Sequence, residues 1–271
     1  MELLGVIFYF VIITGFGIAI TGKLNLPSSQ EIPAALILGS VILGVLLFFL
    51  CILQKINSTS ITVVLVLSIL LTIFHLKPLY YSFKAFFREL NTYIFSGKRY
   101  KYFYVLIIIL LIVWYISLTW TPPRAADAMR YHLAQLKDIM QNGGLVFRPY
   151  YCYNFPMYFT TLFLPVYYLF GGIGVKFAHC FYFFSSVAIA VSLSSKMRIK
   201  NPILLISFFF LIPISFHEAH QVYNDWVLIF YMLAGMFFLV DRLKPNESFP
   251  VRIYLAFLSL GFALGVKYHA V

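Results

Sequence analysis

The feature that most constrains this chain is a series of long apolar runs separated by short polar segments. The first four such runs cover residues 3–20, 34–53, 61–76 and 102–120. An α-helix needs about 20 apolar residues to cross the roughly 30 Å hydrocarbon core of a bilayer. Such a helix also pairs its own backbone N–H and C=O groups, which no water can do there. The sequence therefore predicts an all-α fold, a polytopic bundle of transmembrane helices.

Charge is scarce along the chain, since 62% of the residues are hydrophobic and 11% are charged. That balance leaves too few charges to solvate the surface of a soluble domain. The formal net charge of +11 could indicate nucleic-acid binding, but most lysines and arginines lie in short loops between apolar runs. Anionic headgroups and the excess of basic residues in cytoplasmic loops account for that placement. We expect membrane lipids, and no nucleic acid, among the partners.

A basic and aromatic segment, residues 77–101, divides the chain. Its charged residues are Lys77, Lys84, Arg88, Glu89, Lys98, Arg99 and Lys101. Phenylalanines alternate with these charges, a pattern that is typical of a segment lying in the membrane interface on the cytoplasmic side. We therefore distinguish an N-terminal region of spans plus this segment, residues 1–101, from a second membrane domain, residues 102–271.

The longest polar interruption covers residues 121–156. Within it Met129, Leu133, Leu136 and Met140 recur at helical spacing, which predicts an interfacial amphipathic helix in the first large outer loop. The Asn-Gly-Gly sequence at 142–144 predicts the end of that helix.

The apolar segment 155–172 is not expected to cross the membrane. If it crossed, the basic clusters at 196–200 and 242–244 would lie outside. If it stays in the outer interface, both clusters lie inside, as the positive-inside rule requires. The later runs then alternate in direction: 174–195, 202–216, 226–240 and 253–266. The loops 121–156 and 217–225 consequently share the outer face.

Two acids are predicted to meet at that face. Asp127 lies just before the amphipathic helix and could be a general base that activates a hydroxyl, or simply the N-cap of the helix. Asp225 opens a span, and the same two interpretations apply to it. Ionisable groups at a membrane boundary are costly unless they serve solvation, pairing or function.

Three basic residues could bind a phosphate: Arg130, Arg148 and Lys267. Arginine offers a planar fork of donors and lysine a point charge. Long basic side chains at the ends of spans also extend to the interface without binding a ligand. Residues 217–220, His-Glu-Ala-His, resemble a zinc-protease motif only superficially, because that motif needs its histidines four residues apart.

At this point the sequence resembles a known family. Residues 127–133, Asp-Ala-Met-Arg-Tyr-His-Leu, are similar to the D-x-x-x-Y-H-L opening of the first outer loop in GT-C membrane glycosyltransferases. The bacterial branch related to protein O-mannosyltransferases and lipid A aminoarabinose transferases is the most similar. Further motifs follow in the same order: Gly143-Gly144, Tyr153-Asn154-Phe155-Pro156, Tyr167 to Gly171, Tyr223-Asn224-Asp225 and Gly265-Val266-Lys267-Tyr268. The resemblance covers residues 120–271.

The resemblance implies inverting transfer of a sugar from a polyprenyl-phosphate donor to a glycan, lipid or protein acceptor. The site would face outward from a bacterial plasma membrane. Asp127 would activate or position the acceptor hydroxyl, and Asp225 would orient donor or acceptor. The resemblance also implies five substrate-binding residues: Arg130, Tyr131, His132, Lys267 and Tyr268.

Within that set Lys267, together with Arg130, would stabilise the leaving lipid phosphate as its charge develops, and His132 is a further candidate for this role. No nucleotide is required, because the donor is already activated. A divalent cation stays open, since some relatives use one and others do not.

The chain departs from the family pattern in two ways. Its first acidic loop follows the fourth span rather than the first, and the usual C-terminal spans are missing, so we expect an N-terminal portion that could be inactive alone. Two other classes stay open. A lipid or solute transporter would place ionisable residues in the middle of several spans. In a non-catalytic subunit or degenerate fragment, the two acids would have no role beyond assembly.

Overall fold

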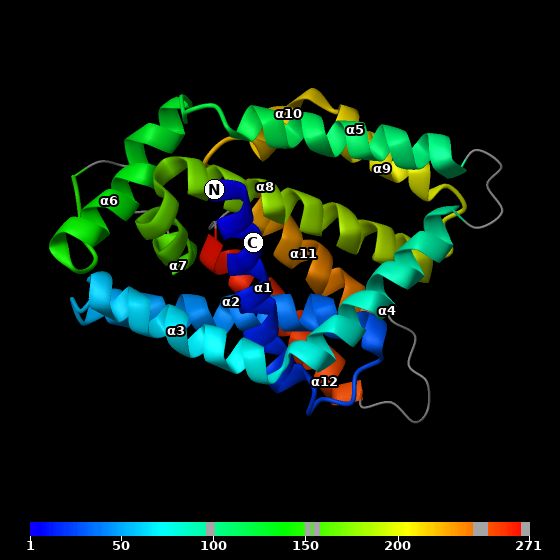
Figure 1. Ribbon diagram of the computed structural model, residues 1–271, viewed down its shortest axis with the longest axis horizontal. Coiled ribbons are helices and arrows are strands. Elements are labelled where there is room, and N and C mark those ends of the chain that lie inside the picture. Colours follow the sequence, from blue (N-terminus) through cyan, green and yellow to red (C-terminus); the bar gives the residue numbers. More distant parts are fainter. Residues whose placement is uncertain (96–100, 150–152, 154–157, 241–248, 267–271) are drawn as a thin grey trace.

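The computed structural model describes residues 1–95, 101–149, 153, 158–240 and 249–266. Over these residues the fold is an all-α bundle, as expected, and contains no strand (Figure 1). The helices are α1 (Glu2–Thr21), α2 (Ser28–Ile52), α3 (Ser58–Phe74), α4 (Leu76–Phe95), α5 (Lys101–Thr119), the π-helix η1 (Ala128–His132), α6 (Leu133–Asn142), α7 (Tyr158–Leu162), α8 (Leu164–Lys196), α9 (Pro202–Leu211), α10 (Pro213–Ala219), α11 (Asp225–Val240) and α12 (Phe249–Val266).

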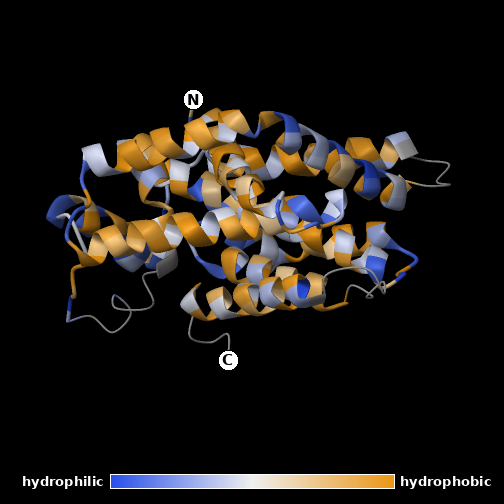
Figure 2. Ribbon diagram, turned by 90° about the horizontal axis from the view of Figure 1, so that it is seen from below, coloured by the Kyte–Doolittle hydropathy of each residue, from blue (hydrophilic) through white to orange (hydrophobic). Residues whose placement is uncertain are grey.

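The apolar helices identify a multi-pass integral membrane protein. Among the described residues, 4 helices are long and apolar enough to cross a membrane, or up to 6 if each of two bent pairs is one span. Figure 2 shows hydrophobic residues along most of the helices, with many of the hydrophilic segments near the two ends of the long axis. Polar ends and an apolar middle are what a bilayer requires of a bundle.

The first helices pack into the same bundle as the later ones. Helices α1 and α2 approach closely at glycines. A Cβ on Gly17 would lie only 1.9 Å from the carbonyl oxygen of Ala35, so no larger residue fits there. Small residues at such contacts let membrane helices approach backbone to backbone. On its other side α1 meets α8, where the rings of Phe10 and Phe181 stack with centroids 3.9 Å apart.

The bundle has two ends, which we name the α4 end, where α4 and α8 finish, and the loop end, where α5 finishes and the loop that follows it begins (Figure 1). At the loop end, Lys176 of α8 donates to Thr121, which follows α5. At the α4 end, the hydroxyl of Tyr93 donates to the carbonyl oxygen of Ile199 and accepts from Ser194. These contacts join the ends of α4 and α8 and place the start of the loop after α5 at the opposite end.

The apolar segment predicted to stay in the interface is broken into short pieces. Its described part contains α7, of 5 residues, and the start of α8. Helix α8 is interrupted at Gly171, where φ is 61° and ψ is −154°, a conformation that glycine alone adopts readily. Neither piece is long enough to cross a bilayer by itself. Helix α7 is buried in the bundle, where Thr161 donates to the carbonyl oxygen of Gly44 of α2, so the segment resembles a re-entrant piece and does not lie along the surface.

One expected span is not continuous. We predicted a run over 202–216, but the structure divides it at Ile212 into α9 and α10, which meet at 67°. The residue before a proline is disfavoured in the helical conformation, and Ile212, which precedes Pro213, is extended with φ −69° and ψ 124°. Helix α9, with 10 residues, therefore ends early, and α10 lies across the loop end.

The basic segment forms a helix that bends away from the direction of α3 and packs against the bundle. Helix α4 follows α3 at an angle of 74°, and its buried residues are Leu79, Ser82, Phe86 and Leu90. Lys77, Lys84 and Arg88 are exposed. One apolar and one basic face are what an interfacial helix needs, so α4 fits the expected interfacial segment.

Candidate functional site

The helix that follows Asp127 begins with a π turn. Residues 128–132 form η1, and α6 continues from Leu133 to Asn142 before Gly143, whose φ is 74°, ends it. The predicted helix and its stop are thus confirmed. Met129, however, is 54% exposed and does not share the buried face of Leu133 and Leu136. A π turn holds more residues than an α turn, so it moves Met129 off the face expected from regular spacing.

Asp127 does not act as a capping residue in this structure. Its backbone is already helical, with φ −68° and ψ −39°, and its side chain makes no capping hydrogen bond. A capping residue normally has a non-helical backbone and accepts from an amide in the first turn. The simple N-cap interpretation therefore fails for Asp127. The carboxylate is exposed at the loop end, where it is free to meet a ligand.

Two segments far apart in the sequence meet through His132. This residue, 6% exposed, stands beside Tyr131, with ring centroids 4.4 Å apart. Its ring also lies 6.1 Å from that of Tyr223, between α10 and α11. The ring of His217 in α10 lies 6.4 Å from Tyr223 on another side. The first and second loops, predicted to share a face, are in contact.

The hydroxyl of Tyr223 lies in a part of the loop end where negative charge gathers. Burial raises the pKa of the Tyr223 hydroxyl above its ordinary value, and the carboxylates of Glu218, Asp127 and Asp225 raise it further. Negative charges have this effect because they repel the phenolate. Asp127 and Asp225 thus both raise the pKa of one hydroxyl, although they come from different loops. Asp225 is half-buried in the first turn of α11, where the helix end also favours a negative charge.

A buried lysine that the sequence analysis missed lies at the loop end. The side chain of Lys176 in α8 is fully buried. Its ammonium donates to the carbonyl oxygen of Thr121 at 2.6 Å and to the hydroxyl of Thr121 at 3.0 Å. A single lysine inside the apolar run 174–195 was the available signal, since an ionisable residue in a span is by default a functional candidate.

His179 and His220 are two further polar side chains at the loop end. Nε2 of His179, one turn after Lys176, accepts a hydrogen bond from the amide of Trp226 at 3.2 Å. Nδ1 of His220 lies 2.6 Å from the carbonyl oxygen of Phe216. Burial lowers the pKa of His220, the hydrogen bond opposes that effect, and the positive charges of Lys176 and His217 lower it further. The positive charge of Lys176 thus lowers the pKa of a histidine in the second loop.

The other predicted phosphate ligands have different surroundings. Nε of Arg148 forms an ion pair with Asp138 at 3.0 Å, and Tyr153 donates to the same carboxylate, so Arg148 helps to fasten α6 to the following loop. Arg130 is exposed and forms no ion pair within the described ranges. Lys267 and Tyr268 lie outside the described residues.

The described residues do not present a metal-binding group. No set of three or more His, Cys, Asp or Glu side chains among them is arranged to hold a metal ion. His217 instead lies beside the carboxylate of Glu218, 3.4 Å away, and His220 bonds to the backbone.

Comparisons with protein-family models, with curated proteins and with solved structures found no match for this chain. The chemical capacity of the loop end follows from its own residues. It offers two carboxylates that can accept a proton or hydrogen bonds. It also offers half-buried aromatic rings and a buried positive charge. Such a set can hold a polar ring and activate one of its hydroxyls.

Proposed function

We propose that this chain is a membrane glycosyltransferase of the GT-C type. It transfers a sugar, with inversion, from a polyprenyl-phosphate donor to a hydroxyl of a glycan, lipid or protein. The observation that carries the proposal is that the loops of Asp127 and Asp225 meet at one end of an apolar bundle, where the rings of His132 and Tyr223 lie 6.1 Å apart. A lipid-borne donor can deliver its head to such an end while its chain stays in the membrane.

The chemical step needs one base and one leaving group. The acceptor oxygen attacks the anomeric carbon as its proton passes to Asp127. The bond from that carbon to the phosphate oxygen breaks, and its electron pair leaves with the lipid phosphate. Attack from the face opposite the phosphate inverts the anomeric centre. Asp225 accepts hydrogen bonds from sugar hydroxyls and fixes their orientation, which lowers the entropic cost of reaching the reactive geometry.

The leaving phosphate gains negative charge in this step, so cations beside it favour the transition state. Arg130 is exposed within the π turn and can offer a fork of donors. Lys176 adds a buried positive charge beneath the loops. In the proposal Lys267 keeps the phosphate-binding role implied by the family resemblance, Tyr131 and Tyr268 contact the sugar, and a divalent cation stays open.

The loop end is proposed to face outward from a bacterial plasma membrane. The opposite, α4 end carries the basic residues Lys84, Arg88, Arg198 and Lys200, which the positive-inside rule places in the cytoplasm. A donor flipped to the outer leaflet would then meet Asp127 and Asp225 directly.

The test follows the leaving group, so the acceptor need not be identified, and the vesicles are prepared from native membranes, whose glycans, lipids and proteins supply acceptor hydroxyls. The full chain in vesicles is given polyprenyl phosphate carrying radiolabelled mannose, glucose or aminoarabinose, and released polyprenyl phosphate is measured by chromatography. We expect release with at least one donor, and Asp127→Asn should reduce it by about 10²–10⁴-fold, the usual contribution of a general base.

Asp138→Asn is the matched control, because that carboxylate is on α6 nearby but is occupied by Arg148 and Tyr153. It should retain release within about twofold, as a substitution away from the reacting groups does. Equal release by the Asp127→Asn and wild-type chains would refute the proposed base. No release from any donor by well-folded wild-type protein would favour a non-catalytic subunit.

A further inference from the structure

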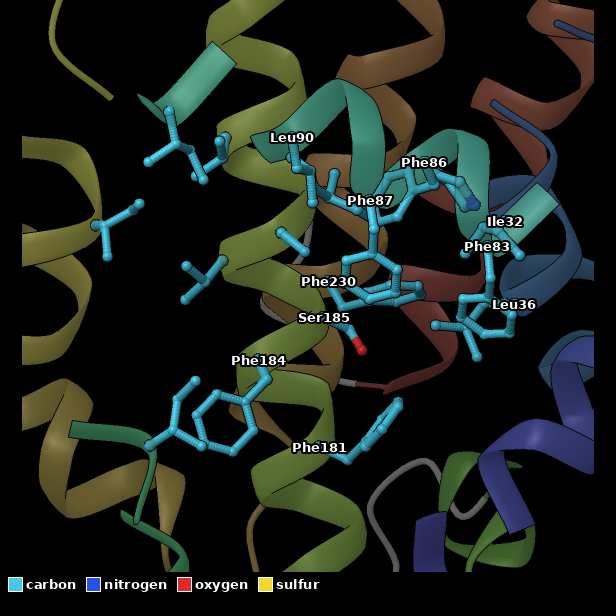
Figure 3. Close-up of a pocket in the computed structure, with 18 of the residues that line it drawn as sticks. Ile32, Leu36, Phe83, Phe86, Phe87, Leu90, Phe181, Phe184, Ser185 and Phe230 are labelled. Atoms are coloured by element: carbon cyan, nitrogen blue, oxygen red, sulfur yellow. The ribbon is translucent and has the colours of Figure 1, made fainter. Parts of the chain in front are cut away.

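An apolar cavity lies between the helices toward the α4 end, away from the candidate site. Its volume is about 330 Å³, within the range of about 300–1,000 Å³ typical of small-molecule sites. Figure 3 shows phenylalanines of α4 and α8 around it, with Ile32 and Leu36 of α2 on one side. Of its described lining residues only Thr14 and Ser185 carry a hydroxyl.

The position of the cavity follows from the helices that line it. On α8 the lining extends from Phe181 to Val191, and on α2 it begins at Ile32. Helix α8 starts at the loop end and α2 starts at the α4 end. The cavity therefore occupies the middle of the bundle and the half that is farther from Asp127. It is separate from the site of the proposed transfer.

A second, hydroxyl-rich pocket of about 650 Å³ lies one helical turn closer to the α4 end. On α8 it is lined by Ser195, four residues beyond Val191, and on α2 by Ser28 and Ser29, four residues before Ile32 and Pro33. Four residues of α-helix span about 6 Å. Helix α4 lines both spaces, so a polar compartment lies next to an apolar one along the axis of the bundle.

The rim of the cavity is basic. Phe87 lines the cavity and is 57% exposed, so it marks where the cavity meets the surface. Its neighbour Arg88 lines the polar pocket, and Lys84 is exposed one turn earlier on α4.

Glu89 is the carboxylate that faces the same pocket. Glu31 of α2 is a second acid here and accepts a hydrogen bond from Ser82 of α4. Arg198 and Lys200, which are exposed at the same end, keep basic groups in excess and favour an anionic head.

We propose that this pair of pockets binds an anionic phospholipid, with an acyl chain in the cavity and the phosphate beside Arg88 and Lys84. Water does not suit the cavity, because a buried water needs two to four polar partners. Acyl chains are the abundant apolar groups beside a membrane helix, and a chain that leaves the bilayer for the cavity can gain close packing against its phenylalanines. A basic side chain near an anionic surface adds about 1 kcal/mol.

The test uses a photoreactive phosphatidylglycerol with a diazirine near the end of one chain. Phosphatidylcholine with the same chain is the matched probe. The full chain is reconstituted in phosphatidylcholine vesicles with a trace of either probe, illuminated, digested and analysed by mass spectrometry. We expect labelling of residues 181–191 of α8. Phosphatidylglycerol should label at least about fivefold more than phosphatidylcholine, the effect of about one basic side chain.

Separate variants test the binding of the acyl chain and the binding of the lipid headgroup. Ala188→Trp fills the cavity from α8 and should reduce labelling at least about tenfold, since forcing a chain into a space that is already filled is at least that unfavourable. Leu204→Trp is its control, because Leu204 is 71% exposed on α9 and outside the cavity. Lys84→Gln with Arg88→Gln, both on the exposed face, should reduce phosphatidylglycerol labelling to the phosphatidylcholine level.

The proposal is wrong if the label is spread evenly over exposed helices such as α5. Equal labelling by the two lipids in the wild-type chain also overturns it, as does undiminished labelling of an Ala188→Trp protein that keeps its thermal transition. If Ala188→Trp does not fold, the paired charge variant still decides. None of these outcomes depends on glycosyl transfer.

Discussion

The two ends of the bundle differ in the surroundings of their charged groups. At the loop end Lys176 is enclosed by protein, and two loops that each carry an acid meet at Tyr223. At the α4 end Lys84 and Arg88 stay exposed, although Arg252 is buried and the ammonium of Lys196 lies over the ring of Phe237. Burying a charge costs several kcal/mol unless it is compensated by polar contacts. The exposed pair on α4 avoids that cost, as the membrane interface allows, whereas Lys176 bears a cost that function can explain.

Charge reversal of one lysine at each end gives the largest contrast. Lys176→Glu would place a carboxylate against the carbonyl oxygen of Thr121 in a fully buried position. We expect a loss of roughly 3–5 kcal/mol of stability, as for other uncompensated buried charges, seen as a large fall in Tm or failure to fold. Lys84→Glu, on the exposed face of α4, should change stability by no more than about 0.5 kcal/mol. Similar Tm values for both variants would remove the distinction between the ends.

Asp225→Asn should give the next largest effect. If Asp225 orients the sugar, its loss should lower release of polyprenyl phosphate about 100-fold, a typical consequence of misplacing the reacting groups. The same variant should keep its Tm within a few degrees, because a carboxylate in the first turn of a helix contributes only about 0.3–1 kcal/mol. A large fall in Tm with unchanged release per folded molecule would indicate a purely structural acid.

The pH dependence of stability sharpens the comparison further. The pKa of His220 is lowered in the folded state by burial and by neighbouring positive charges. Below the ordinary histidine pKa of about 6.5 the unfolded chain therefore binds more protons than the folded one. The stabilising contribution is complete above that pH and is lost as the pH falls through the folded pKa. Thermal melts from pH 8 to 5 should show the loss, and His220→Gln should make the slope shallower.

The smallest expected effect concerns the pair that fastens α6 to the following loop. The pKa of Asp138 is lowered, chiefly by its hydrogen bond from Arg148. Its contribution is therefore present above the ordinary aspartate pKa and is lost as the pH falls through the folded value. Asp138→Asn should cost about 1 kcal/mol or less at neutral pH, since exposed ion pairs contribute little. A Tm loss as large as that of Lys176→Glu would show that this loop is coupled to the whole bundle.

Local patterns in the sequence predicted much of this structure. Apolar runs located most of the long helices, and the Asn-Gly-Gly sequence located the end of α6. The expectation failed at Ile212, where the apolar run continues through Pro213 but the helix does not. A hydropathy pattern contains no information on the missing N–H of a proline or on the steric restriction that proline places on the residue before it. A run of apolar residues therefore predicted one span where the structure has two helices at an angle.

By itself the sequence determined the all-α membrane fold, because each helix pairs its own backbone and its apolar length can be read locally. It also identified Asp127 and Asp225 as acids at polar turns. Only the tertiary structure decided that the loops of these acids meet at His132 and Tyr223 and that Lys176 is enclosed against Thr121. The physical reason is that such contacts join residues from different helices. Their distances depend on how the helices pack and bend, which no local pattern in the sequence records.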